Sequence, residues 1–176
     1  MLDWSAALAI APYSWTDIGI ALLCGTIIGL ERQLRGKPAG IRTSILIVTG
    51  TYLFIATSMS INSEMIDPSR IIGQVITGVG FLGAGVMLSR DGVVVGVTSA
   101  ATIWVLAAIG VSIGVGHGLV AVKLSVLVVI ILIGIDFLED SSSILRRGVH
   151  QTYKVWFGKR KGRLFRRRKL NKKTKI

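Results

Sequence analysis

Long stretches that are almost free of charged residues are the feature that most constrains the fold of this chain. About 20 helical residues are enough to cross a hydrocarbon layer of roughly 30 Å, so runs of this length are typical of membrane spans. A soluble bundle would need helices with a charged outer face, and these runs have none. The sequence therefore predicts an all-α, polytopic transmembrane helix bundle. We expect about five spans, near residues 15–30, 41–61, 71–88, 97–115 and 119–137.

The positive charge of the chain is concentrated at its C-terminal end. The 176 residues have a net charge of +12, and residues 141–176 contain 14 Lys or Arg and no acid. We therefore divide the chain into a transmembrane domain, residues 1–140, and a basic tail, residues 141–176, which lies on the membrane surface or is disordered. Anionic lipid headgroups attract such a tail by about 1 kcal/mol per cation. We expect headgroups, or next an acidic protein, as its partner, and no nucleic acid.

The distribution of cations also predicts the orientation of the chain. Cytoplasmic loops of membrane proteins are enriched in Lys and Arg near the ends of the spans. The loop after the first expected span carries Arg35 and Lys37, and the basic tail follows the fifth span on the same side, whereas the opposite side has Arg70. We expect the N-terminus on the outer or periplasmic side and the C-terminus in the cytoplasm. No removable signal peptide is evident, because the N-terminus lacks a basic region.

Small residues recur at helical spacing within the expected spans. Gly25 and Gly29 are four apart, and the segment GVGFLGAG (residues 78–85) contains four glycines. In lipid, such spacing lets helix backbones approach closely. We expect closely packed helices and regard self-association into a homo-oligomer as compatible with the pattern. A phosphate-binding loop is disfavoured, because GVGFLGAG lacks the Lys that such loops require.

Charged residues at the end of the first expected span form the best candidate site. The sequence predicts that Glu31 pairs with Arg35 on the next helical turn. We expect Glu31, Arg32 and Arg42 to form a partly desolvated network that joins the first two spans. Polar groups at membrane depth are costly unless they are used, so this network is either a structural clamp or a functional surface.

The connection between the third and fourth expected spans is predicted to contain non-helical structure. Residues 90–92 are typical of a turn, and the β-branched residues 93–97 favour a short extended or re-entrant piece. Thr98 and Ser99 are residue types that cap helix N-termini. We expect them to begin the helix that carries Trp104.

Three ordered motifs of this chain resemble the MgtC/SapB family of bacterial inner-membrane proteins. They are GTIIGLERQLRGKPAGIRT (25–43), GVGFLGAGVML (78–88) and GVTSAATIWVLAAIGVSIGVG (96–116). Longer members carry a C-terminal ACT-like domain, and this chain looks like the short form without it. The motif residues that we take as functional candidates are Gly29, Glu31, Arg32, Gly40, Arg42, Thr43, Gly78, Gly80, Phe81, Gly83, Gly85, Gly96, Thr98 and Trp104.

The resemblance implies a modulator of other membrane proteins, linked to magnesium limitation, acid stress and virulence. Its implied partners include the F-type ATP synthase. The alternative is a transporter of ions or small solutes, related to Mg²⁺. The expected span interiors offer mainly hydroxyl and amide groups to such a pathway, so a protomer would have to oligomerise to form a pore.

Catalysis and resident metals are not expected from this sequence. His117 and His150 lie in separate compartments and have no Cys or His companion at the spacing of zinc ligands. No nucleophile and base stand at a spacing that suggests a catalytic pair. We therefore expect no enzyme activity, no cofactor and no metal site.

Overall fold

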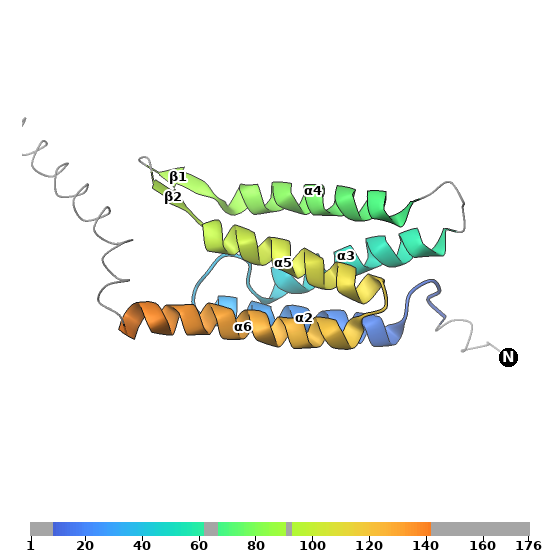
Figure 1. The fold of residues 1–176 in the computed structure, drawn as a ribbon, viewed down its shortest axis with the longest axis horizontal. Coiled ribbons are helices and arrows are strands. Elements are labelled where there is room, and N and C mark those ends of the chain that lie inside the picture. The colour runs from blue at the N-terminus through green and yellow to red at the C-terminus, as the bar shows by residue number, and fades with distance from the viewer. Residues whose placement is uncertain (1–8, 62–66, 91–92, 142–176) are drawn as a thin grey trace, which may run out of the picture. The chain divides into compact units, whose positions relative to one another are not determined.

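The computed structural model of the protein describes residues 9–61, 67–90 and 93–141 (Figure 1). The chain divides into two compact units, residues 1–130 and residues 131–176, and the last helix crosses the division. The basic tail lies outside the described residues beyond Ser141. The elements in chain order are α2 (Trp15–Leu34), α3 (Ile41–Ser60), α4 (Pro68–Val86), β1 (Leu88–Arg90), β2 (Val93–Val95), α5 (Val97–Gly114) and α6 (Gly118–Ser141).

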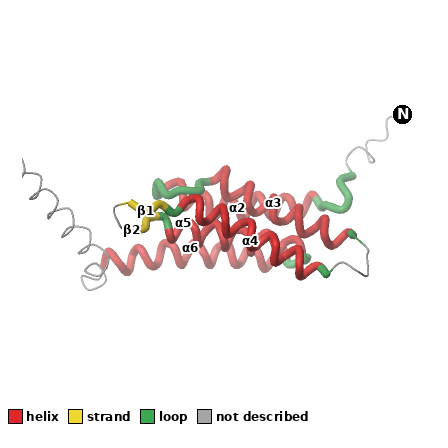
Figure 2. Tube along the Cα trace, turned by 90° about the horizontal axis from the view of Figure 1, so that it is seen from above, coloured by secondary structure: helices red, strands yellow, loops and turns green. Residues whose placement is uncertain are grey.

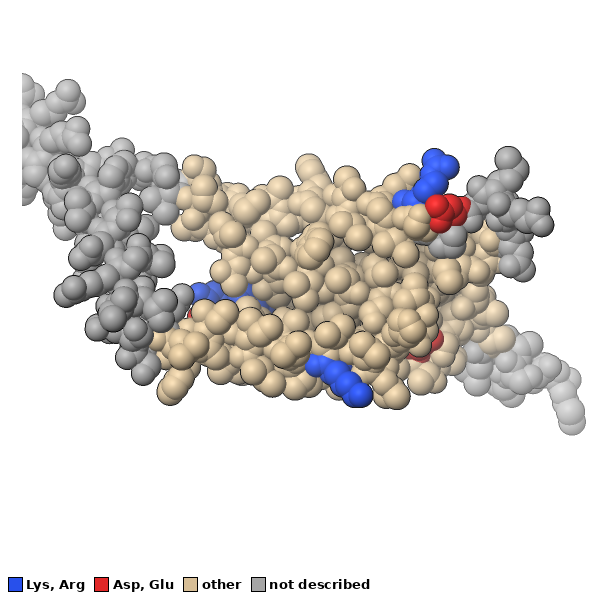
Figure 3. Space-filling view, in the orientation of Figure 1, with Lys and Arg blue, Asp and Glu red and all other residues tan. Residues whose placement is uncertain are grey.

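The predicted all-α bundle is confirmed. Four of the described helices, α3 to α6, are long and apolar enough to cross a membrane by length and composition. Helix α2 is also 20 residues long, but it carries Asp17, Glu31 and Arg32 and falls outside that criterion. The count of about five spans is therefore roughly matched, with α2 as the fifth helix. Uncharged residues cover most of the face seen in Figure 3.

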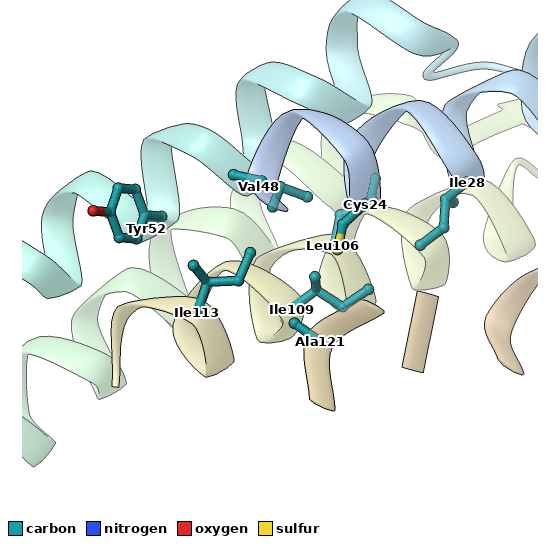
Figure 4. Close-up of a cluster of buried hydrophobic side chains, with 9 residues drawn as sticks. Cys24, Ile28, Val48, Tyr52, Leu106, Ile109, Ile113 and Ala121 are labelled. Carbon is teal, nitrogen blue, oxygen red and sulfur yellow. The ribbon is translucent and has the colours of Figure 1, made fainter. Parts of the chain in front are cut away.

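The core of the first unit lies among α2, α3, α5 and the first half of α6. Helix α3 packs between α2 and α5, and α4 packs mainly on α5. Apolar side chains from each of these helices except α4 meet in one buried cluster (Figure 4). Its members are Ala21, Cys24, Ile28, Val48, Tyr52, Leu106, Ile109, Ile113 and Ala121. A second, smaller cluster joins α4 to α5 through Val79, Ile103 and Ala107.

Glycines allow α2 and α5 to approach α3 closely, as the spacing predicted. A Cβ atom on Gly25 would lie 2.6 Å from the Cα atom of Ile45, and one on Gly110 would lie 2.6 Å from the carbonyl oxygen of Val48. Real Cβ atoms do not come this near to a backbone, so any side chain at these positions would force the helices apart.

The connection between α4 and α5 is a short antiparallel hairpin, seen beside the helix ends in Figure 2. Leu88 pairs with Val95 in β1 and β2, which agrees with the extended piece expected after residue 92. Residues 91 and 92 of the expected turn lie outside the described residues.

The expected N-cap of α5 was wrong. The helix begins at Val97, and its N-cap is Gly96 with φ of +93° rather than Thr98 or Ser99. A Cβ atom at Gly96 would collide with the carbonyl oxygen of Val86. The chain turns from strand to helix through a left-handed residue, which favours glycine over the hydroxyl residues that follow.

Candidate functional site

Two charged residues in the last turns of α2 are buried. Glu31 is 7% exposed and Arg32 is 2% exposed, although they follow directly on one another. Arg32 is among the largest side chains that the described residues bury. Burial of a charge is costly unless the group is paired and hydrogen-bonded, so the partners of these two side chains define what this end of the bundle does.

Arg32 connects α2 to α5. Its Nη2 atom donates a hydrogen bond to the Oγ atom of Ser99 at 2.6 Å, in a buried position. Ser99 lies in the first turn of α5, directly after the hairpin. This single contact therefore fixes the end of α2 against the start of α5 and the hairpin that leads into it. Ser99, expected from the sequence as a capping residue, is instead the partner of Arg32.

The predicted pairing of Glu31 with Arg35 is confirmed. The Nε atom of Arg35 lies 2.9 Å from Oε1 of Glu31, as an ion pair without the alignment of a hydrogen bond. The other carboxylate oxygen, Oε2, and the Nε atom of Arg32 are buried and have no hydrogen-bond partner among the described residues. Glu31 and Arg32 therefore keep one hydrogen-bond acceptor and one donor that no described residue uses.

The expected network through Arg42 does not form. Arg42 and Thr43 are exposed on the first turn of α3, and Arg42 has no ion-pair partner among the residues that the structure describes. The reason is geometric, because α3 approaches α2 here through backbone contacts: a Cβ atom on Gly29 would lie 2.6 Å from the Cα atom of Ile41. Side chains cannot occupy that interface, and Arg32 turns to α5 instead.

The loop between α2 and α3 is held by an amide side chain. The backbone N–H of Ile41 donates to Oε1 of Gln33 at 3.3 Å. Gly40 is the N-cap of α3, and a Cβ atom there would lie 3.0 Å from the same oxygen. Gln33 thus supplies the acceptor that a capping side chain would otherwise provide, and Gly40 leaves room for it. The candidate residues Gly29 and Gly40 therefore have a packing role in the bundle.

Helix α4 presents a stripe of small residues that is exposed in the described structure. A Cβ atom on Gly73 or Gly80 would have no atom within 4 Å, and the same holds for Gly78 and Gly85. Gly73, Thr77, Gly80 and Ala84 are exposed and follow one another at i, i+4, i+7 and i+11, which places them on one helical face. We call these four residues the α4 stripe. Its spacing is readable in the sequence once Thr77 and Ala84 are counted with the glycines.

An apolar groove lies between α3 and α4, and none of the stripe residues lines it. Its volume is about 540 Å³. Gly50 and Gly78 line it without a neighbour at the Cβ position, and Leu46, Phe54 and Leu82 line it as exposed apolar side chains. In a bilayer this groove faces either lipid tails or another protein.

The remaining candidates from the motifs divide between the two faces of the α4–α5 pair. Gly83 is buried, and a Cβ atom there would lie 3.4 Å from the carbonyl oxygen of Ala100. Phe81 is 80% exposed and Trp104 is 52% exposed. Thr98 is exposed near the start of α5, and its carbonyl accepts a hydrogen bond from Thr102. The structure therefore does not bring the candidate residues together into a single site.

Comparison with known proteins places this arrangement in a family. The sequence profile of the MgtC family matches residues 18–141. YhiD of Escherichia coli strain K12, provisionally named a magnesium transporter, is 48% identical over 119 residues, which cover 64% of this chain and 55% of YhiD. The protein MgtC of Salmonella typhimurium strain LT2 is 45% identical over 97 residues, 55% of this chain and 41% of MgtC.

A relative from Bacillus subtilis is similar over a comparable share of the chain. The protein SapB of Bacillus subtilis strain 168 is 40% identical over 126 residues, which cover 66% of this chain and 52% of SapB. The chain spans about half the length of the curated relatives it matches. No solved structure matches. With its apolar helices and a family match from α2 to the end of α6, the chain is an integral membrane protein and belongs to the MgtC family.

Proposed function

We propose that this protein is a non-enzymatic modulator in the bacterial inner membrane that acts by contacts with other membrane proteins. The observation that carries the proposal is the contrast between the glycines of α4 and those of α2 and α5. Gly25, Gly29, Gly110 and Gly114 all lie against α3, whereas Gly73, Gly78, Gly80 and Gly85 have no neighbour. Small-residue faces in membranes are typical of helix–helix contacts.

The occupant that fits this face is a transmembrane helix of a different membrane protein. The α4 stripe allows close backbone approach along four helical positions, Gly73, Thr77, Gly80 and Ala84. Lipid tails alone gain nothing from a row of small residues, because they do not need close backbone approach. A second copy of this chain is an alternative occupant that the experiment below separates.

Site-specific crosslinking tests this proposal. A photo-crosslinking residue at Thr77, in the stripe, is expected to capture another membrane protein, and Gly80→Leu is expected to abolish the adduct. Ala108 is an exposed alanine on α5, so a crosslinker there and the variant Ala108→Leu are matched controls. Adducts that contain only this chain, or adducts that persist in Gly80→Leu, would contradict the proposal.

Transport of a cation is the second candidate function. It is favoured by one observation, the buried Glu31 carboxylate whose Oε2 atom has no hydrogen-bond partner among the described residues. Mg²⁺ flux into proteoliposomes that is lost in Glu31→Gln would favour transport over modulation. Equal flux with and without the protein would leave the modulator as the supported function.

A further inference from the structure

A second cavity lies at the opposite end of the bundle from Glu31. It has a volume of about 240 Å³ and is lined by residues from the start of α2 and from the ends of α3 and α5. Asp17 is the only acidic residue of its lining, which also includes Tyr52, Ser60 and Gly114. Asp17 and Glu31 are 14 residues apart on α2, which is about 21 Å along the helix. The cavity is therefore independent of the Arg32 contact.

One acid and two helix C-termini border this cavity, while the N-terminus of α2, which carries Asp17, contributes partial positive charge. Helices α3 and α5 end at Ser60 and Gly114, and the carbonyl ends of helices carry a partial negative charge. The carboxylate of Asp17 has no ion pair or hydrogen bond with any described residue. The carbonyl of Gly114 also accepts none, because the N–H groups of residues 115 to 117 donate to the carbonyls of residues 111 to 113. Two unused acceptors thus line one cavity.

One lining residue of the cavity, Tyr52, is buried and hydrogen-bonded. Tyr52 is 2% exposed, and its Oη atom accepts a hydrogen bond from the backbone N–H of Ser14 at 2.9 Å. This bond ties the start of α2, three residues before Asp17, to the last turns of α3. The Tyr52 hydroxyl is therefore held in place by the packed core.

The donor set fits an ammonium group better than a metal ion. Mg²⁺ and Ca²⁺ are bound by several oxygen ligands, usually with more than one carboxylate where the protein supplies the site. The described residues contain no group of three His, Cys, Asp or Glu side chains that could hold a metal. A primary ammonium needs three acceptors, and Asp17, Gly114 and a hydroxyl of Tyr52 or Ser60 supply that number.

The position of the cavity indicates where such a group comes from. Trp15 is 60% exposed beside Asp17, and Tyr13 precedes it. Trp and Tyr are enriched where the bilayer meets water, so the cavity opens at the depth of lipid headgroups. We propose that the Asp17 cavity binds a primary ammonium group, either of an ethanolamine lipid or of a free amine. This site is separate from the contact face on α4.

Lipid retention measured by native mass spectrometry tests the lipid source. The full chain is purified from membranes and placed in nanodiscs that contain equal amounts of phosphatidylethanolamine and phosphatidylcholine. We expect retention of the ethanolamine lipid over the choline lipid, because a quaternary ammonium has no N–H to donate. Asp17→Asn is expected to lower that retention about tenfold, the loss of one charge-assisted hydrogen bond. Asp67→Asn, at an exposed acid that caps α4, is the matched control.

A series of thermal-shift measurements tests whether a free amine binds. The variant Asp17→Glu controls for misfolding. Methylammonium is expected to raise the melting temperature of delipidated protein if free amines bind, and tetramethylammonium is not. Asp17→Glu is expected to restore part of the retention that Asp17→Asn loses, which a folding defect would not allow. Equal retention of both lipids together with no shift by methylammonium would overturn the proposal. Binding of either amine that is unchanged in Asp17→Asn, or a shift with Mg²⁺ but with neither amine source, would overturn it as well.

Discussion

Arg32 at the end of α2 and Ser99 at the start of α5 are joined by a buried hydrogen bond of 2.6 Å, although 67 positions separate them in the chain. Arg32 has few alternatives, because backbone contacts between α2 and α3 leave no space for its side chain there. The contact therefore ties together the two segments that carry the most distinctive motifs of the sequence. Its energetic weight can be measured directly.

We predict that Arg32→Met lowers the free energy of unfolding by about 2 kcal/mol, since a hydrogen bond to a charged group contributes 1.5–3 kcal/mol. Arg32→Lys is expected to restore little of this, because an ammonium does not reproduce the reach and geometry of the guanidinium. Thermal or denaturant unfolding in mild detergent is the measurement. Arg42→Met, at an exposed arginine, is the control and should change stability by less than about 0.5 kcal/mol.

Two glycine variants should have opposite effects. Gly25→Ala places a Cβ atom 2.6 Å from the Cα atom of Ile45 and is expected to destabilise the protein by about 1–3 kcal/mol through overpacking. Gly80→Ala meets no atom within 4 Å and is expected to be neutral or to stabilise α4 by up to about 1 kcal/mol. The measurement is unfolding of both purified variants in the same detergent. Equal changes in their free energies of unfolding would contradict this prediction.

Gly96→Ala should weaken the junction between the hairpin and α5. Its φ of +93° is unfavourable for any residue with a Cβ atom, and that atom would meet the carbonyl oxygen of Val86. We expect a loss of about 1–3 kcal/mol, the range for a residue held in a disfavoured conformation. Hydrogen exchange should report faster opening of the first turn of α5, while exchange in α3 stays unchanged.

The stability that the N-cap contributes to α4 should depend on pH. Hydrogen bonds from the side chain and backbone of Ser69 hold the pKa of Asp67 below its ordinary value. A lowered pKa in the folded state means that the cap contributes above the pKa of the unfolded chain and is lost as pH falls through the folded value. Protection from hydrogen exchange at the start of α4, relative to the intrinsic rate at each pH, should therefore fall below about pH 4, and Asp67→Asn should remove this dependence.

Cysteine labelling should test the predicted orientation of the chain in the membrane. Cys24 is buried and is the only cysteine of the chain, so Cys24→Ser gives a background without thiols. We expect an impermeant thiol reagent to label His117→Cys from outside and Lys37→Cys only after the cells are opened. Labelling of both positions from the same side would show that the predicted orientation is wrong.

The sequence predicted those features that arise within a single helix or from its surroundings in the bilayer. Uninterrupted apolar runs predicted the helices, and the i, i+4 spacing predicted the pair between Glu31 and Arg35. It failed where two distant segments meet. Nothing in the spacing of Arg32, Arg42 and Ser99 tells which hydroxyl or acid an arginine reaches, because that depends on how closely Gly29 lets α3 approach.

The same limit applies to the glycines. In the sequence, the glycine-rich segment of α4 and those of α2 and α5 look alike, and close packing was expected for all. The structure separates them, because Gly110 lies against Val48 while Gly80 faces open space. Only the arrangement of the helices distinguishes a glycine that serves packing within the chain from one that is left for something else.

The hydrogen bond from Arg32 to Ser99 also constrains how this protein is made. When α2 leaves the ribosome, its arginine has no partner, because Ser99 is 67 residues from being synthesised. Until then the guanidinium has to remain hydrated at the edge of the bilayer, which its long side chain permits. The bundle therefore closes late during biogenesis, when the start of α5 reaches the membrane and takes Arg32 out of water.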